Sequence, residues 1–303
     1  MASSRMIRVG NAPCSWGVIE NVGGERVTYR TVLDEIAATG YQGSELGDRG
    51  FMPTDAGQLR EEFAARGLQL IGSWVSVHLH VPQKWSEDVD LALQTARLLA
   101  DVGGEHAVVI LGNDPHTDRV RTQKAGRITA ADGLDDHTWA AFAEGADRLA
   151  YAVREECGLQ TVFHPHIATY VETPEEIARL LHSTDPDLLG LALDTAHIAY
   201  GGGDPLEILS RFGSRVHHVH FKGYSHAAAE RCRRDRIDGV TAVSRGVFCE
   251  LSDSDVAFPS ILKALRDLGY EGWIVVEQDV LPGTGTPREN ALRNRDYLRS
   301  IGL

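Results

Sequence analysis

The chain has 303 residues, of which 43% are hydrophobic, and its formal net charge is −13 at pH 7. This size suits one α/β domain over residues 1–303, and the acidic balance disfavours binding to nucleic acid. No apolar stretch approaches the ~20 residues that span a bilayer, and the first ten residues lack a signal-peptide pattern. The four cysteines show no paired spacing, which favours a reducing compartment. We therefore expect a cytoplasmic protein without nucleic-acid or membrane partners.

Short apolar runs alternate about eight times with longer segments of helical spacing. This alternation is typical of repeated βα units and predicts an α/β fold, a single (β/α)8 TIM barrel. A doubly wound open sheet is the competing architecture, but Gly10-Asn11-Ala12-Pro13 stands where a glycine-rich dinucleotide motif would follow the first strand. The expected strands begin near Ile7, Gly43, Leu70, His106, Leu159, Leu188, Val216 and Trp273.

Two connections between the expected elements are unusually long. Residues 112–137 and 223–259 form long loops after strands 4 and 7. Because both segments follow strands, both are expected at the carboxyl face of the barrel, where lids and binding segments lie. Thr173-Pro174-Glu175-Glu176 combines a capping residue, a first-turn proline and a glutamate, and so marks a helix start. Further helices are expected over 32–38, 56–65, 89–99 and 140–156.

The seventh expected strand, residues 216–222, carries three histidines and a lysine. Strand alternation places His218, His220 and Lys222 on one face, with His220 nearer the carboxyl end. We expect this face to point into the barrel. Lys222 at the rim could stabilise an enolate or, with a lowered pKa, transfer a proton; the alternative is a surface lysine paired with an acid.

Carboxylates end two further apolar strands. Asp194 begins Asp194-Thr195-Ala196-His197, so a carboxylate and an imidazole follow one strand; the alternative is that Asp194 caps a helix and His197 packs against it. Glu277 ends an apolar run, where a buried carboxylate needs a metal, a proton or a partner such as arginine. Asp279 follows on the same face.

The fifth expected strand ends in His164-Pro165-His166, with Glu172 just before the helix start. His164 or His166 could complete a metal shell, and the sequence does not decide between them. Similar polar groups follow other strands, namely Glu45, His78 and His80. A mixed nitrogen and carboxylate shell favours Mn²⁺ or Co²⁺, with Zn²⁺ or Fe²⁺ as alternatives, over Ca²⁺ and Mg²⁺.

These motifs, taken in order, resemble the xylose-isomerase-like TIM-barrel family, and most closely its inosose dehydratases. They span nearly the whole chain. The segments that carry the resemblance are Asn11-Ala12-Pro13-Cys14-Ser15-Trp16-Gly17, Gly43-Ser44-Glu45-Leu46-Gly47, Phe163-His164-Pro165-His166, Tyr170-Val171-Glu172-Thr173, Leu193-Asp194-Thr195-Ala196-His197, His218-Val219-His220-Phe221-Lys222 and Val276-Glu277-Gln278-Asp279.

The resemblance implies a divalent metal at the carboxyl rim, with Asp194, His220 and Glu277 at three ligand positions. The fourth ligand of the family is usually a glutamate at the end of the fifth strand, where this chain has His164, with His166 and Glu172 as alternatives. A second departure is the segment 250–255, where inosose dehydratases tend to have a glycine-containing turn.

The reaction implied by the resemblance is removal of water from 2-keto-myo-inositol (2-inosose), a step of myo-inositol breakdown, through an enolate. His197, His166 or Glu172 would take the α-proton, and Lys222 would protonate the departing hydroxyl. The partner would be a small keto-cyclitol or keto-sugar, and association of identical chains as a homo-oligomer stays open. The alternatives are a sugar isomerase or epimerase, a non-catalytic sugar-binding barrel, and the related apurinic-site endonuclease.

Overall fold

The computed structural model describes residues 7–18, 27–103, 106–113, 118–280 and 283–303. In these ranges the strands are β1 (Ile7–Asn11), β2 (Gly43–Glu45), β3 (Gln69–Val77), β4 (Val108–Asn113), β5 (Gln160–Phe163), β6 (Leu189–Asp194), β7 (Val216–Tyr224), β8 (Phe248–Cys249) and β9 (Gly272–Glu277). The α-helices are α1 (Tyr29–Ala38), α2 (Ala56–Ala64), α3 (Trp85–Val102), α4 (Arg119–Lys124), α5 (Asp136–Cys157), α6 (Pro174–Ser183), α7 (Thr195–Tyr200), α8 (Pro205–Phe212), α9 (His226–Arg234), α10 (Gly239–Ser244), α11 (Phe258–Asp267) and α12 (Pro287–Ser300).

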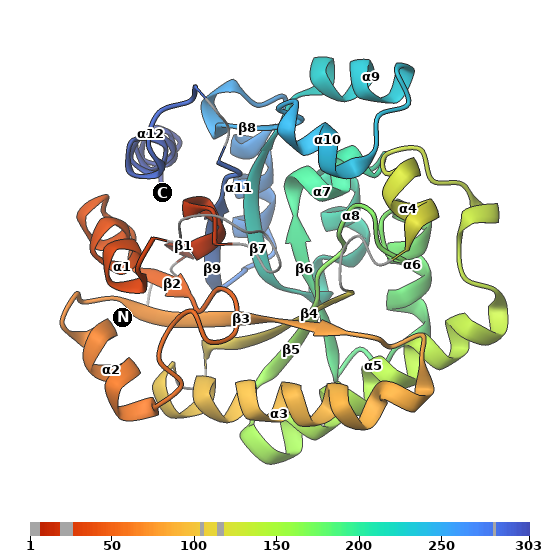
Figure 1. The fold of residues 1–303 in the computed structure, drawn as a ribbon, viewed down its shortest axis with the longest axis horizontal. Coiled ribbons are helices and arrows are strands. Elements are labelled where there is room, and N and C mark those ends of the chain that lie inside the picture. The colour runs from red at the N-terminus through yellow and green to blue at the C-terminus, as the bar shows by residue number, and fades with distance from the viewer. Residues whose placement is uncertain (1–6, 19–26, 104–105, 114–117, 281–282) are drawn as a thin grey trace.

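The parallel strands close into a ring. Neighbours run from β1 through β7 in chain order, β9 pairs with both β7 and β1, and the β6–β7 pairing completes the circle. Helices surround the strands (Figure 1). The predicted TIM barrel is therefore confirmed. The sequence did not reveal β8, a two-residue strand that pairs antiparallel with Gly223 and Tyr224 at the end of β7.

Alternation along each strand decides which side chains enter the barrel. On β7 the apolar Val219 and Phe221 join the main core between strands and helices, so His218, His220 and Lys222 point to the opposite, inner side. Small apolar clusters fill the interior alongside these polar groups. They are Ala12, Ile71, Trp273 and Val275 in one, and Val108, Ile110, Val162 and Ala192 in the other.

Both long connections contain short helices. α4 lies between β4 and α5, while α9, α10 and β8 lie between β7 and α11. The two connections also bind each other, because the Arg233 guanidinium donates to the Gly126 carbonyl at 3.0 Å and Arg127 donates to the Ile237 carbonyl at 2.9 Å. The two segments thus form one packed unit over the carboxyl ends of the strands.

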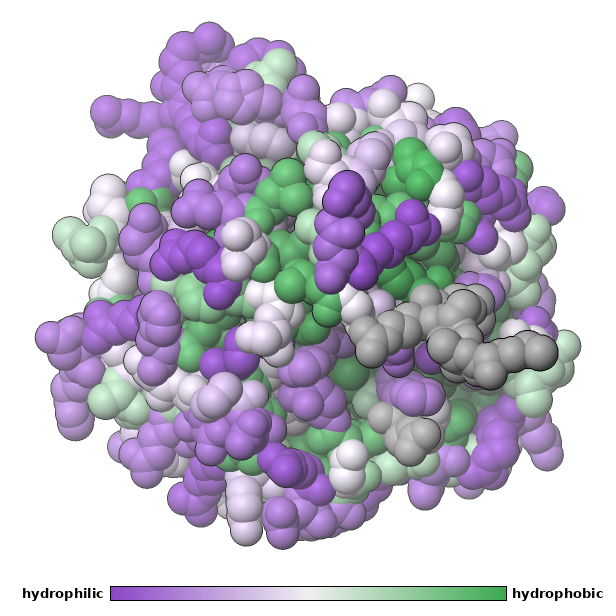
Figure 2. Space-filling view, turned by 180° about the vertical axis from the view of Figure 1, so that it is seen from behind, coloured by the Kyte–Doolittle hydropathy of each residue, from purple (hydrophilic) through white to green (hydrophobic). Residues whose placement is uncertain are grey.

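Helix starts follow the capping chemistry of the sequence. Thr173 and Glu176 form the predicted capping box at the start of α6. Asp55 caps α2, and Asp194 caps α7 directly after β6. On the face drawn in Figure 2, hydrophilic residues predominate and hydrophobic residues show between them nearer the centre. Among the described residues, no helix has the length and apolar character to cross a membrane.

Candidate metal centre and active site

Strand register brings the predicted acids and imidazoles together. Asp194 on β6 is the direct partner of His220 on β7, and Lys222 on β7 is the partner of Glu277 on β9. Because all three strands are parallel and adjacent, their carboxyl ends meet at one rim. His164 follows β5, the next strand around the ring, and completes the group.

Three short separations link the four side chains, and His220 takes part in two of them. His220 Nδ1 lies 3.3 Å from Glu277 Oε1 and 3.7 Å from Asp194 Oδ2. His164 Nε2 lies 3.6 Å from the same Asp194 oxygen. All three separations are longer than the usual range of a protein hydrogen bond. Two atoms that each bond one cation at ~2.1 Å lie about 3.0 to 3.4 Å apart, so the spacing suits shared ligation.

Asp194 divides its two carboxylate oxygens between different tasks. Oδ1 accepts from the backbone N–H groups of Ala196 and His197 at 2.9 and 2.8 Å, and so caps α7. Oδ2 is buried and has no hydrogen-bond partner among the described residues, and the same holds for His220 Nδ1. Leaving such atoms unpaired is costly unless a cation or proton lies between them. These two atoms therefore fit a metal ion.

Charge in the centre also calls for a cation. Burial alone would lower the pKa of His220, but the carboxylates of Glu277 and Glu45 outweigh burial and raise the pKa to about 9. A proton on this ring is one way to balance the surrounding acids, and a divalent ion is another. His164, Asp194 and His220 offer ligand atoms that all lie within 4.8 Å of one another.

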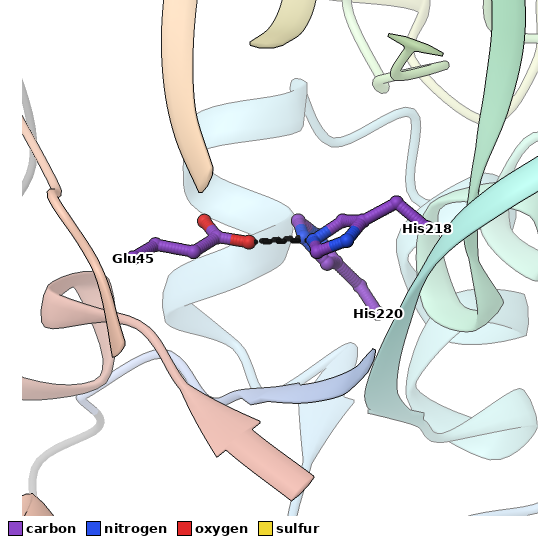
Figure 3. Close-up of side chains that lie close together, drawn as sticks. All are labelled: Glu45, His218 and His220. Carbon is purple, nitrogen blue, oxygen red and sulfur yellow. Dashed lines mark hydrogen bonds and ion pairs between the residues drawn. The ribbon is translucent and has the colours of Figure 1, made fainter. Parts of the chain in front are cut away.

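Glu45 and His218 form a second group on the inner side of the barrel (Figure 3). Glu45 Oε1 lies 2.8 Å from His218 Nε2 and 2.9 Å from His220 Nε2. All three side chains are buried. The two distances are those of ordinary hydrogen bonds, so one carboxylate oxygen accepts from both rings.

Lys222 lies beside this centre, held by two acids. Its Nζ is 3.4 Å from Glu277 Oε2 and 3.3 Å from Asp279 Oδ2, and 4.9 Å from the centroid of the Phe248 ring. Burial would lower the pKa of Lys222, but Asp279 and Glu277 outweigh burial and raise it. The direction is opposite to the lowered pKa considered from the sequence. Lys222 is therefore an ammonium near neutral pH that can stabilise negative charge, and it is acidic enough to protonate only a strong base such as a departing hydroxide.

His166 and His197 lie against each other, with ring centroids 3.9 Å apart and ring planes tilted by 34°. Both contact the peptide groups of Ile167. His166 Nδ1 is 2.6 Å from the Ile167 carbonyl, while His197 Nδ1 accepts from the Ile167 N–H at 3.3 Å. These contacts assign the proton to Nδ1 in His166 and to Nε2 in His197. His166 Nε2 thus carries a lone pair, whereas His197 Nε2 carries a hydrogen.

Burial lowers the pKa of His197 well below its ordinary value, and the neighbouring His166 and Lys222 lower it further. His197 is therefore neutral near pH 7. A neutral ring whose Nε2 holds the proton is a hydrogen-bond donor in its resting state. The two neighbouring histidines differ in this way because Nδ1 of His166 donates to the Ile167 carbonyl, whereas Nδ1 of His197 accepts from the Ile167 N–H.

Glu172 is placed differently from the other candidates. Its Oε1 accepts from the Gly126 N–H and its Oε2 from the Ala168 N–H, both at 2.6 Å. Burial raises its pKa to about 7, although the two amides oppose that shift. Glu172 thus joins the connection after β4 to the loop after β5, and this arrangement favours an anchoring role.

Three residues with close contacts to the centre received no role from the sequence. They are Glu45, which the sequence marked only as a polar group after a strand, together with Phe248 and Trp74. Phe248 packs edge-on against His197, and Trp74 packs edge-on against His164. For Glu45 the available signal was its position at the end of the second expected strand.

Comparison with known proteins places this geometry in a family. A family model described as xylose isomerase-like TIM barrel matches residues 33–301. An inosose dehydratase of Geobacillus kaustophilus (strain HTA426) is 34% identical over 293 residues, covering 96% of this chain and 93% of its own. An inosose dehydratase of Lacticaseibacillus casei is 31% identical, with 96% of both chains covered.

A solved structure shares the fold at low sequence identity. The probable 3-DHS dehydratase AsbF from Bacillus anthracis superposes with a TM-score of 0.71 at 15% identity, covering 97% of this chain and 99% of its own. The curated relatives support hydro-lyase activity for this chain. With the closed ring of parallel strands and a family match over most of its length, the chain belongs to the xylose isomerase-like TIM barrel family.

Proposed function

We propose that this chain is a metal-dependent hydro-lyase that removes water from 2-keto-myo-inositol (2-inosose). Relatives named inosose dehydratase, at 34% and 31% identity over nearly the full length, support a keto-sugar dehydratase. The observation that carries the metal dependence is the facing pair of buried, unpaired atoms, Asp194 Oδ2 and His220 Nδ1. The proposed ligands are Asp194, His220 and Glu277, with His164 as the fourth.

The donor set guides the choice of metal. Two imidazole nitrogens and two carboxylates form a mixed shell, which suits Mn²⁺ or Co²⁺, with Zn²⁺ or Fe²⁺ as alternatives. When bound, a divalent cation would polarise the substrate ketone and offset the negative charge that develops on its oxygen. Every other task in the reaction belongs to side chains of the barrel.

His166 is the proposed base. Its Nε2 lone pair follows from the Nδ1–H bond to the Ile167 carbonyl, and the ring lies 5.9 Å from the His164 ring, measured between centroids. Nε2 takes the proton from the carbon beside the ketone, and the C–H electron pair forms the enolate. His197 Nε2–H donates to a substrate oxygen in the same site. Positioned acid–base groups of this kind typically contribute ~100- to 10,000-fold in rate.

Lys222 is the proposed acid. The enolate electrons re-form the ketone and expel the hydroxyl on the next carbon, which takes a proton from the Lys222 ammonium and leaves as water. The product is an unsaturated hydroxyketone that tautomerises to a diketone. The site is reset when the proton on His166 is lost to solvent and Lys222 gains one, so atoms and charge balance over the cycle.

The proposal is tested with metal-loaded protein and 2-inosose, followed by ultraviolet absorbance. Dehydration creates a conjugated, strongly absorbing product. An isomerase or epimerase uses the same enolate but returns the proton to carbon, so it gives a new sugar without absorbance. A non-catalytic sugar-binding barrel gives ligand binding and neither product. Absorbance that rises with keto-inositols supports the hydro-lyase, and its absence under saturating metal contradicts it.

A further inference from the structure

Glu45 reaches the metal centre from the far side of His220. It is the last residue of β2, and its side chain meets those of His218 and His220 from β7 inside the ring (Figure 3). In chain order Glu45 lies 175 residues before His220. The exposed fraction of Glu45 is 5%, so these side chains meet where bulk water does not reach.

The two ring nitrogens of His220 make different kinds of contact. Nε2 is 2.9 Å from Glu45 Oε1, the length of a charge-assisted hydrogen bond. Nδ1 is 3.3 Å from Glu277 Oε1 and 3.7 Å from Asp194 Oδ2, with no hydrogen-bond partner among the described residues. A hydrogen therefore lies between Nε2 and Glu45, while Nδ1 faces the two acids that are proposed to hold the metal.

This arrangement fixes what His220 presents to a cation. When Nε2–H donates to Glu45, the lone pair of the neutral ring is on Nδ1, directed toward Asp194 and Glu277. A carboxylate behind a ligating imidazole fixes the ring's orientation and increases its basicity, and loss of such a group typically lowers metal affinity 10- to 100-fold.

His218 holds Glu45 in place. Its Nε2 lies 2.8 Å from the same Oε1, so the carboxylate oxygen is shared between two rings. The exposed fraction of His218 is 1%, so this contact is also shielded from bulk water. His218 thereby fixes the orientation of the carboxylate that His220 meets.

Glu45, His218 and His220 also satisfy the spacing of a three-ligand group. Ligation there would bring three donor atoms around one ion, with about 3.0 to 3.4 Å between neighbouring atoms. The observed 2.8 and 2.9 Å are shorter than that and equal hydrogen-bond lengths. The cluster of His164, Asp194, His220 and Glu277 is therefore the better metal site, and Glu45 lies behind it.

We propose that Glu45 is a positioning residue for the metal centre, acting through His220: it holds the hydrogen on Nε2 so that Nδ1 binds the ion. This inference rests on the proposed metal dependence and goes beyond it by assigning a residue outside the ligand set. Glu45 does not contact the metal, and its effect is on the affinity and ligand field of the ion.

The test measures dissociation constants for Mn²⁺ and Co²⁺ by competition with a chromophoric chelator, together with the visible absorption of the Co²⁺ protein. Glu45→Gln keeps the size of the side chain and one acceptor oxygen but removes the charge. We expect affinity to fall 10- to 100-fold and the Co²⁺ bands to shift, with far-ultraviolet circular dichroism unchanged. Glu45→Asp, which keeps the charge but shortens the reach, should also weaken binding and serves if Glu45→Gln does not fold.

Asp88→Asn is the matched control. Asp88 is another buried carboxylate that pairs with an imidazole, at 3.1 Å from His78 Nδ1, and it belongs to neither three-ligand group. Its substitution should leave metal affinity and the Co²⁺ bands unchanged. If Asp88→Asn and Glu45→Gln lowered metal affinity equally, the loss of any buried acid would explain the effect, and the proposal would be overturned.

Asp194→Asn and His218→Ala separate the remaining outcomes. If Asp194→Asn abolishes metal binding while Glu45→Gln binds as tightly as the unmodified protein, the ligand set stands and the positioning role fails. If Asp194→Asn keeps full affinity, the proposed metal centre itself fails. Complete loss of binding in His218→Ala would assign the ion to the group of Glu45, His218 and His220, and would also overturn the inference.

Discussion

Asp194 and His220 are register partners on the parallel strands β6 and β7, and their side chains face each other with Oδ2 and Nδ1 3.7 Å apart. Backbone pairing thus sets the separation of two potential ligand atoms before any ion is present. Since Oδ1 of Asp194 is bound to the start of α7, its second oxygen is held toward His220. The centre is therefore preorganised by the strands and by one helix cap.

Asp194→Asn should abolish metal retention without unfolding the barrel. The amide oxygen can still accept from the N–H groups of Ala196 and His197, so the cap of α7 is kept. The amide nitrogen then replaces the oxygen that faces His220, and a donor there cannot bind a cation. Metal analysis after gel filtration and far-ultraviolet circular dichroism check both parts. Glu277→Gln and His220→Ala should behave alike. Stoichiometric metal in all three variants would show that these residues are not the metal ligands.

Lys222→Met should reduce kcat by ~100- to 10,000-fold while metal stays bound, because the proposed proton donor is lost but no ligand is changed. Steady-state absorbance kinetics with 2-inosose give kcat, and metal analysis gives occupancy. Lys222→Arg is the control, since it keeps a cation between Glu277 and Asp279 and should retain more activity than the methionine variant. A Lys222→Met protein with unchanged kcat would show that the departing hydroxyl takes its proton from elsewhere.

His166→Gln and His197→Gln should differ in proton exchange. In D₂O the enolate regains deuterium, so NMR of recovered 2-inosose measures α-proton abstraction apart from water loss. His166→Gln removes the proposed base and should suppress exchange by ~100-fold or more. His197→Gln keeps a side-chain N–H and should still exchange. The reverse order would assign the base to His197 and would contradict the protonation set by the Ile167 peptide groups.

Glu172→Gln should change how stability depends on pH. The folded-state pKa is raised to about 7 from the ordinary value of 4.5, so the folded protein holds this proton over a range where the unfolded chain has released it. The contribution of Glu172 is thus greatest below pH ~4.5 and is lost as pH rises through ~7. The 2.5-unit difference corresponds to about 3 kcal/mol.

Urea unfolding between pH 5 and 8 measures this effect. Relative to Glu172→Gln, the unmodified protein should lose about 3 kcal/mol of unfolding free energy across that interval, less the part already lost by pH 5. Parallel curves for the two proteins would show that the two amide donors keep Glu172 ionised throughout, and that its pKa lies near the ordinary value.

The fold and the inner face of β7 could be predicted from the sequence because both depend on local periodicity. Alternation of period two was enough to place His218 and His220 on one side, and the structure has both of them buried against Glu45. The eight-fold repeat of strands and helices was enough for the barrel. Capping chemistry at Thr173 likewise depends on four consecutive residues.

Local sequence patterns could not predict contacts between distant segments. Nothing near Glu45 indicates that its carboxylate meets β7, because that contact arises only when the ring closes. The contacts of the Ile167 peptide groups could not be predicted either, because backbone groups are the same in every residue type. The connections after β4 and β7 were expected as loops, but Asp118, Ser225 and Asp238 each cap a short helix there. The sequence did not indicate these helices because segments of six to nine residues give weak periodic signals.

Metal-dependent dehydration is tested most directly by turnover of 2-inosose by chelator-stripped protein as Mn²⁺ or Co²⁺ is added back, followed by ultraviolet absorbance. We expect negligible turnover without metal, a rise to a plateau at one equivalent per chain, and no rise in Glu277→Gln. Full turnover by protein shown to be free of metal, or a response to metal that survives the loss of Glu277 and His220 together, would contradict this expectation.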